Sequence, residues 1–231
     1  MDQFTILSGD KLKEWERARS KTMSLFTYGG FINGLLINGY YSTMYQYVQR
    51  MVNDKNTEQY YSLLLGLPMI AGAVSSFIGS IYYDFTKNVK QAIICSLALM
   101  ITGNIIYALP YSIYLVTLGY AMILCQSIAL ATMYAEINHI FLPEQLTATT
   151  GRIAISRALG TLAGPCLALG FSKVNVEIGS WTLSAGNMPA VVFGGMCLIS
   201  LFFAMKITNL AKIYDLKAVH VAKRERSIGN A

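Results

Sequence analysis

The sequence holds few residues that could do acid–base or nucleophilic chemistry, and they are not clustered. Glu136, His139 and Arg157 lie within or beside long apolar runs, without the acid or nucleophile that catalysis would need nearby. The four cysteines fall in four different apolar runs with no CxxC spacing, so we expect them to be buried small hydrophobic residues. With no Walker loop and no HExxH motif either, the sequence predicts a protein that is not an enzyme and holds no metal or cofactor.

The composition indicates where these residues must lie. Of 231 residues, 54% are hydrophobic and only 13% are charged, which is more apolar surface than a soluble core can bury. No charged residue occurs between Lys21 and Arg50, and no Lys or Arg occurs between Lys90 and Arg152. Since a helix crosses a bilayer in about 20 residues, these gaps predict an all-α integral membrane protein.

Six apolar segments are long enough to be transmembrane helices, and together they predict a membrane domain over residues 22–208. A basic segment precedes this domain at 1–21, and a basic tail follows it at 209–231. Six crossings place both termini on one side. The predicted spans cover about 22–49, 60–83, 91–109, 111–141, 149–171 and 189–205.

Basic residues set the predicted orientation. The net charge is +6, and the Lys and Arg residues stand at the ends of apolar runs, so they indicate membrane topology and no nucleic-acid partner. By the positive-inside rule both termini are expected to be cytosolic. The loop with Arg50 and Lys55 is then outside despite its two basic residues, which Asp54 and Glu58 accompany.

Several short motifs resemble those of one family. The segment Gly79–Lys90 places a small residue, an acid and basic residues in the loop after the second span, as the major facilitator superfamily does. Gly160–Pro165 is similar to that family's Gly-xxx-Gly-Pro element, and Tyr134–Glu144 resembles the segment before it. With Gly103–Ala108 and Gly186–Ala190, the chain looks most like the lysosomal branch associated with ceroid lipofuscinosis.

The resemblance covers residues 25–205 and implies the N-terminal six-helix half of a twelve-helix carrier. In that family the substrate cavity lies between two halves, so the chain is expected to be a fragment, a truncated product or a half that pairs with another subunit. Two departures stand out. Phe85 occupies the place of a basic residue, and no Lys or Arg between Gln91 and Gly151 can supply the span-four arginine that the family often links to proton coupling.

The resemblance also assigns roles to two motifs. Asp84 and Lys87 are expected to form a gating loop whose charges hold one face closed, while the alternative is a solvated loop that only sets topology. Gly160, Gly164 and Pro165 are expected to form a conformational element, because two glycines allow close helix contact and the proline adds a bend.

Polar residues within the apolar segments could line a path for a polar substrate. Neutral ones could instead hydrogen-bond between helices, each for about 0.6 kcal/mol, and the charged ones could pair or extend to the interface. The tyrosines near span ends, such as Tyr40, Tyr47 and Tyr83, are expected in an aromatic interface belt. The candidate path residues are Asn33, Asn38, Asn104, Gln126, Glu136 and Arg157.

Three functions remain open on this reading. The first is a carrier half that moves a small solute or ion across a lysosomal or other endomembrane by alternating access, with a second six-helix half or a second copy as its partner. The second is a non-transporting truncated or partner membrane protein. The third is an ion channel built by oligomerisation. Each has the lipid bilayer as its surroundings.

Overall fold

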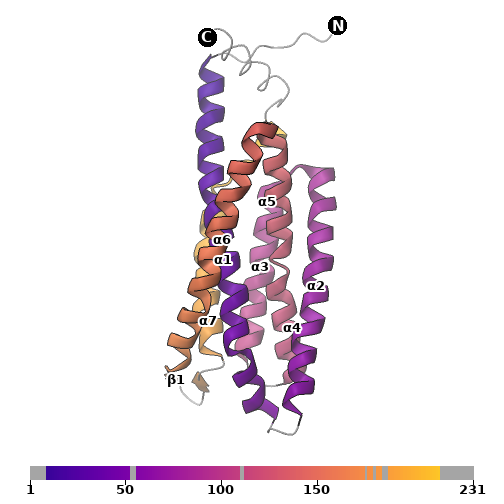
Figure 1. Cartoon of the computed structure of the whole chain (residues 1–231), viewed down its shortest axis with the longest axis vertical. Coiled ribbons are helices and arrows are strands. Elements are labelled where there is room, and N and C mark those ends of the chain that lie inside the picture. The colour runs from indigo at the N-terminus through magenta and orange to yellow at the C-terminus, as the bar shows by residue number, and fades with distance from the viewer. Residues whose placement is uncertain are drawn as a thin grey trace.

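The protein is a bundle of long helices that run roughly along a common axis, as Figure 1 shows. The computed structural model describes residues 9–52, 56–109, 112–174, 176–178, 181–183 and 187–213. The helices are α1 (Gly9–Val52), α2 (Thr57–Thr86), α3 (Val89–Ala108), α4 (Ile113–Leu124), α5 (Ser127–Ile140), α6 (Pro143–Ser172), α7 (Met188–Ala204) and the short α8 (Leu210–Ile213).

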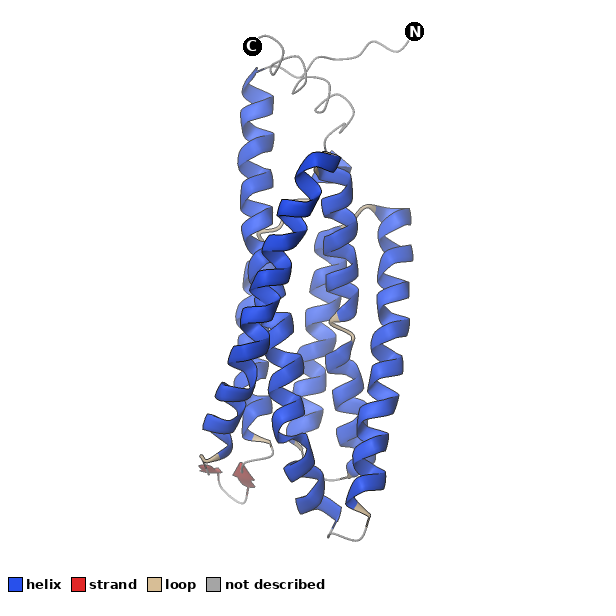
Figure 2. Cartoon of the chain, in the orientation of Figure 1, coloured by secondary structure: helices blue, strands red, loops and turns tan. Residues whose placement is uncertain are grey.

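The described strands form one small hairpin outside the bundle, which leaves the fold class all-helical in its body. Strands β1 (Val176–Ile178) and β2 (Trp181–Leu183) pair antiparallel between α6 and α7. Figure 2 shows this hairpin at the end of the bundle away from the start of α1.

Four helical segments are long and apolar enough to cross a membrane, which makes the protein an integral, multi-pass membrane protein. They are α2, α3, α4 together with α5, and α6 up to Phe171, and they overlap the predicted second to fifth spans. The first predicted span lies inside α1, and the sixth lies in α7, an apolar helix of 17 residues. The count of six spans stays a prediction.

The observed helix bounds differ from the predicted spans at several places, and α6 begins at Pro143 instead of at about residue 149. Helix α1 is continuous from Gly9, so the basic segment before the first span is part of the same helix. The predicted span 111–141 is two helices separated by a turn at Cys125 and Gln126. Lys55, Gly186 and the basic residues after 213 lie outside the described residues.

A side chain from the neighbouring helix contributes to that turn. The Ser96 hydroxyl on α3 donates to the Cys125 carbonyl oxygen at 3.1 Å. Nearby amides shift to the tighter spacing, since the Gln126 N–H donates to the Ile123 carbonyl at 3.2 Å and the Ile128 N–H donates to the Cys125 carbonyl at 3.0 Å. The α-helical hydrogen-bond pattern is therefore interrupted at Cys125 and Gln126, where neither residue is a proline or a glycine.

Helix packing leaves apolar side chains facing outward on several helices, α2 and α6 among them. Helix α1 makes its most extensive contact with α6, while α3 packs on α4 and α7, and α2 packs on α4 and α5. Phe77 on α2 and Leu162 on α6 remain 68% and 71% exposed. Exposed apolar surface of this kind fits contact with lipid or with another membrane helix.

The prediction of an aromatic belt is wrong for several of the tyrosines. Tyr40 and Tyr47 are buried inside the bundle, where the Tyr40 ring lies 4.9 Å from the Tyr107 ring and 5.2 Å from the Phe193 ring, between centroids. The Tyr47 hydroxyl donates to the Tyr107 carbonyl at 2.9 Å. These side chains join α1 to α3 and α7, because interior aromatic rings supply large contact areas.

Candidate functional site

The predicted gating residues meet at the end of α2. Lys87 adopts a left-handed conformation with φ of 50°, and its N–H donates to the Tyr83 carbonyl at 2.8 Å, which ends the helix. The Lys87 Nζ lies 3.4 Å from Asp84 Oδ1 and 3.0 Å from Nε2 of His139 on α5. Asp84 is 70% exposed, so this ion pair lies at a solvent-facing end of the bundle.

Glu136 lies about one helical turn before His139 on α5 and is completely buried. Its carboxylate accepts a hydrogen bond from the Tyr83 hydroxyl of α2. It accepts a second one, at 3.1 Å, from the backbone N–H of Ala211 in α8. Arg157 lies half-buried on α6. The ion pair found among the described residues joins Asp84 to Lys87 and includes neither Glu136 nor Arg157. Glu136 is therefore held by hydroxyl and amide donors from α2 and α8.

The segment after α7 is tied to the loop between α2 and α3. The Asn209 amide donates to Asn88 Oδ1 at 2.9 Å, and Asn209 Oδ1 accepts from the Lys90 N–H at 2.9 Å. Asn88 also caps α3 by accepting from the Gln91 N–H at 3.1 Å. Together with the Glu136 bond to α8, these contacts fix the end of α7 against α3 and α5.

The predicted conformational motif forms a close backbone contact between α6 and α1. A side-chain carbon at Gly160 would overlap the carbonyl oxygen of Phe31, and one at Gly164 would overlap that of Leu35. Only glycine permits two helices to approach this far. Pro165 follows inside α6 and removes one helical hydrogen bond.

Hydrogen bonds flank the glycine contact and account for Asn38. Its side-chain amide donates to Thr161 Oγ1 at 3.1 Å and to the Gly34 carbonyl at 3.2 Å, and the Ser156 hydroxyl donates to the Thr27 carbonyl at 2.7 Å. Asn104 is used similarly between α1 and α3, since it accepts from the Tyr40 hydroxyl. Two of the four neutral path residues therefore hold helices together.

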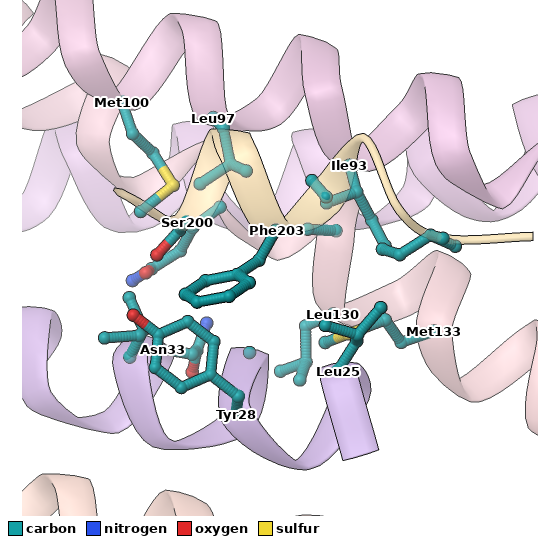
Figure 3. Close-up of a pocket in the computed structure, with 16 residues that line it drawn as sticks. Leu25, Tyr28, Asn33, Ile93, Leu97, Met100, Leu130, Met133, Ser200 and Phe203 are labelled. Atoms are coloured by element: carbon teal, nitrogen blue, oxygen red, sulfur yellow. The ribbon is translucent and has the colours of Figure 1, made fainter. Parts of the chain in front are cut away.

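Asn33 and Gln126 line one cavity of about 60 Å³ within the bundle. It lies among α1, α3, α5, α7 and the turn between α4 and α5, and Figure 3 shows the Phe203 ring pointing into it above Tyr28 and Asn33. The Tyr28 and Phe203 rings meet edge to face with centroids 5.5 Å apart. The cavity brings together two candidate path residues that are 93 positions apart in the chain.

A family model described as the Major Facilitator Superfamily matches residues 19–226. The chain belongs to the major facilitator superfamily. No curated protein and no solved structure matches it. The match reaches from Arg19 in α1 past α8 and so includes the loop, the glycine contact and the cavity.

As a major facilitator, the protein belongs to a family of transporters rather than enzymes. The described residues hold no group of three or more His, Cys, Asp or Glu side chains placed to bind a metal ion. The match ends at the level of the superfamily, so the lysosomal branch stays a prediction.

Sequence reasoning missed the residues that complete these sites. Tyr83 was assigned to the interface, although its hydroxyl serves Glu136, and Asn209 was assigned to a tail. Phe203 and Ser200 of the cavity carry no signal in the sequence, because an apolar or small residue in an apolar helix is the expected composition. Asn209 could have been found, since an asparagine after a span can cap a neighbouring helix.

Proposed function

We propose that this major facilitator moves a small solute or ion across a membrane by alternating access, with α1 to α7 acting as one six-helix half in which α4 and α5 together form one span. The superfamily match carries this proposal. Alternating access in such carriers is largely a rocking of one rigid half against the other. The glycine contact between α1 and α6 and the ties from Asn209 to Asn88 support a body of the required rigidity.

The proposed partner is a second six-helix half, either another unit or a second copy of this chain. Two outward-facing helices, α2 and α6, offer apolar surface for it through residues such as Phe77 and Leu162. The lipid bilayer would cover the remaining apolar surface. We place both termini in the cytosol on the positive-inside rule, and a lysosomal or other endomembrane location follows from the sub-family resemblance.

Within this mechanism the loop after α2 acts as a gate. Lys87 is placed between Asp84 and His139, so its charge links the end of α2 to the end of α5. Such a contact is exposed and therefore weak, which suits a contact that must break in each cycle. Gly160, Gly164 and Pro165 would keep α1 and α6 together while the halves move.

A non-transporting partner protein is the second candidate function. It is favoured by Asn38 and Asn104, which are used in helix contacts and so are not free to line a substrate path. An oligomeric ion channel is the remaining alternative.

Flux through liposomes that contain the purified chain tests these functions. The probes are radiolabelled amino acids, sugars and nucleosides, and trapped pyranine for protons. We expect saturable uptake that is lost in Gly164→Leu, reduced in Asp84→Asn and retained in Gly170→Leu, since a side chain at Gly170 meets open space. Absence of flux from folded wild-type protein would leave the partner function, and a non-saturable proton leak would indicate a channel.

A further inference from the structure

Two carboxamide side chains in the bundle cavity carry buried polar atoms that have no hydrogen-bond partner among the described residues. Asn33 is 5% exposed and Gln126 is 2% exposed. Among the described residues, Asn33 Oδ1 and both Oε1 and Nε2 of Gln126 have no hydrogen-bond partner. Buried polar atoms in native proteins are nearly always satisfied by protein, water or ligand. These three atoms therefore require an occupant that both donates and accepts hydrogen bonds.

The turn between α4 and α5 belongs to this site. Gln126 stands at the turn, and its backbone N–H is bonded to the Ile123 carbonyl at 3.2 Å. The backbone is therefore satisfied locally, while the side-chain amide is left for the cavity. Asn33 lines the same cavity from α1, on the far side of the Phe203 ring from Leu97 in Figure 3.

The other walls of the cavity restrict the occupant to an uncharged molecule. They are mostly apolar side chains, such as Leu97, Met133 and Phe203, and none of the described residues that line the cavity is charged. The Ser200 hydroxyl already donates to the Met196 carbonyl at 2.8 Å. A volume of about 60 Å³ has room for a few waters or one small molecule. A charged ligand would lose its hydration here without gaining a counter-ion.

We propose that this cavity is a binding site for a small uncharged molecule with a carboxamide or hydroxyl group and a short apolar part. The molecule's donor would donate to Asn33 Oδ1 or Gln126 Oε1, and its acceptor would accept a hydrogen bond from Gln126 Nε2. Its apolar part would contact Phe203 and Met133. The site lies within a single six-helix body and needs no second half. Its existence can therefore be tested separately from transport.

Thermal unfolding of the full chain in detergent provides the test, with propionamide as the probe. Propionate and propylammonium have a similar size but carry a charge at neutral pH. We expect propionamide to raise the melting temperature of the wild type in a saturable way, with no rise from the two ions. The rise should disappear in Gln126→Leu and in Asn33→Leu. It should persist in Gln46→Leu, a matched change at an exposed position of α1.

Equilibrium dialysis of radiolabelled propionamide keeps the proposal falsifiable if a cavity variant fails to fold. Wild-type chain should bind it saturably, near one molecule per chain. Absence of saturable binding to folded wild type would overturn the proposal and leave a cavity that holds only water. An equal rise with all three compounds, or an equal rise in Gln126→Leu and Gln46→Leu, would also overturn it, because the effect would then come from the solvent.

Discussion

Glu136 connects three helices through one carboxylate. It lies on α5, accepts from the Tyr83 hydroxyl on α2 and accepts from the Ala211 N–H on α8. Both Glu136 and Tyr83 are completely buried, so neither can replace a lost partner with bulk water. A buried polar group left without its partner costs the full desolvation penalty of that group, about 1–3 kcal/mol.

The Tyr83→Phe substitution should therefore lower the free energy of unfolding by about 1–3 kcal/mol, since it removes one donor to Glu136 and keeps the ring. Tyr82→Phe at the adjacent, half-buried position is the matched control and should change stability by less than about 0.5 kcal/mol. Denaturant titration in detergent measures both variants. Equal losses in the two variants would mean that the Tyr83 hydroxyl contributes nothing through Glu136.

At this scale the sequence identified the polar residues but not their partners. A polar side chain in an apolar run is visible by composition, which is how Asn33, Gln126 and Glu136 were selected. Which neighbour each one meets depends on helix rotation and on contacts between distant segments. Tyr83 and Phe203 were missed for that reason, because an aromatic residue is ordinary both at an interface and in a core.

At the scale of elements, the positions of prolines and glycines do not predict where the helices break. Helices α2 and α6 continue through Pro68 and Pro165. The break between α4 and α5 has neither residue, and the Ser96 hydroxyl on α3 takes part in it by bonding the Cys125 carbonyl. The long apolar segments could be predicted from the sequence because length and composition decide them, whereas this break depends on a neighbouring helix.

The glycine contact gives a sharp comparison within α6. Gly160→Leu should lower stability by about 3 kcal/mol or more, because its side chain would overlap the Phe31 backbone and force α1 and α6 apart. Gly151→Leu on the same helix meets open space and should be neutral or stabilising by up to about 1 kcal/mol. Melting curves in detergent compare the two. Equal destabilisation would contradict a close contact between α1 and α6.

At the scale of the whole molecule, the ends of the helices fall into two groups. Figure 1 shows the start of α1, the junction of α2 with α3 and the junction of α5 with α6 at one end. The hairpin and the ends of α1 and α3 lie at the other. Lys87, Lys90 and Lys206 belong to the first end, which the positive-inside rule predicts to be cytosolic.

Cysteine labelling tests whether α1 and α7 cross the membrane, as the six-span topology predicts. With the native cysteines replaced by alanine, Glu14→Cys and Lys212→Cys should react with an impermeant maleimide in sealed vesicles whose cytosolic face is outward. Glu58→Cys and Val174→Cys should react only after permeabilisation, since each lies across α1 or α7 from those positions. If Glu14→Cys and Glu58→Cys were labelled from the same face, α1 would not cross the membrane.

The length of α1 has a mechanical consequence. At 1.5 Å per residue its 44 residues extend about 66 Å, about twice the hydrocarbon thickness of a bilayer. Its start carries Lys11, Lys13 and Arg17, and Arg19 lies between the rings of Trp15 and Phe141, 4.7 and 4.9 Å from their centroids. Sliding this unbroken helix inward would drag those charges toward lipid, at about 2.5–3.5 kcal/mol for each that reached the bilayer centre. Helix α1 is therefore expected to keep a fixed depth in the membrane. When the bundle moves, the other helices are expected to rotate about α1, and α1 is not expected to shift along the membrane normal.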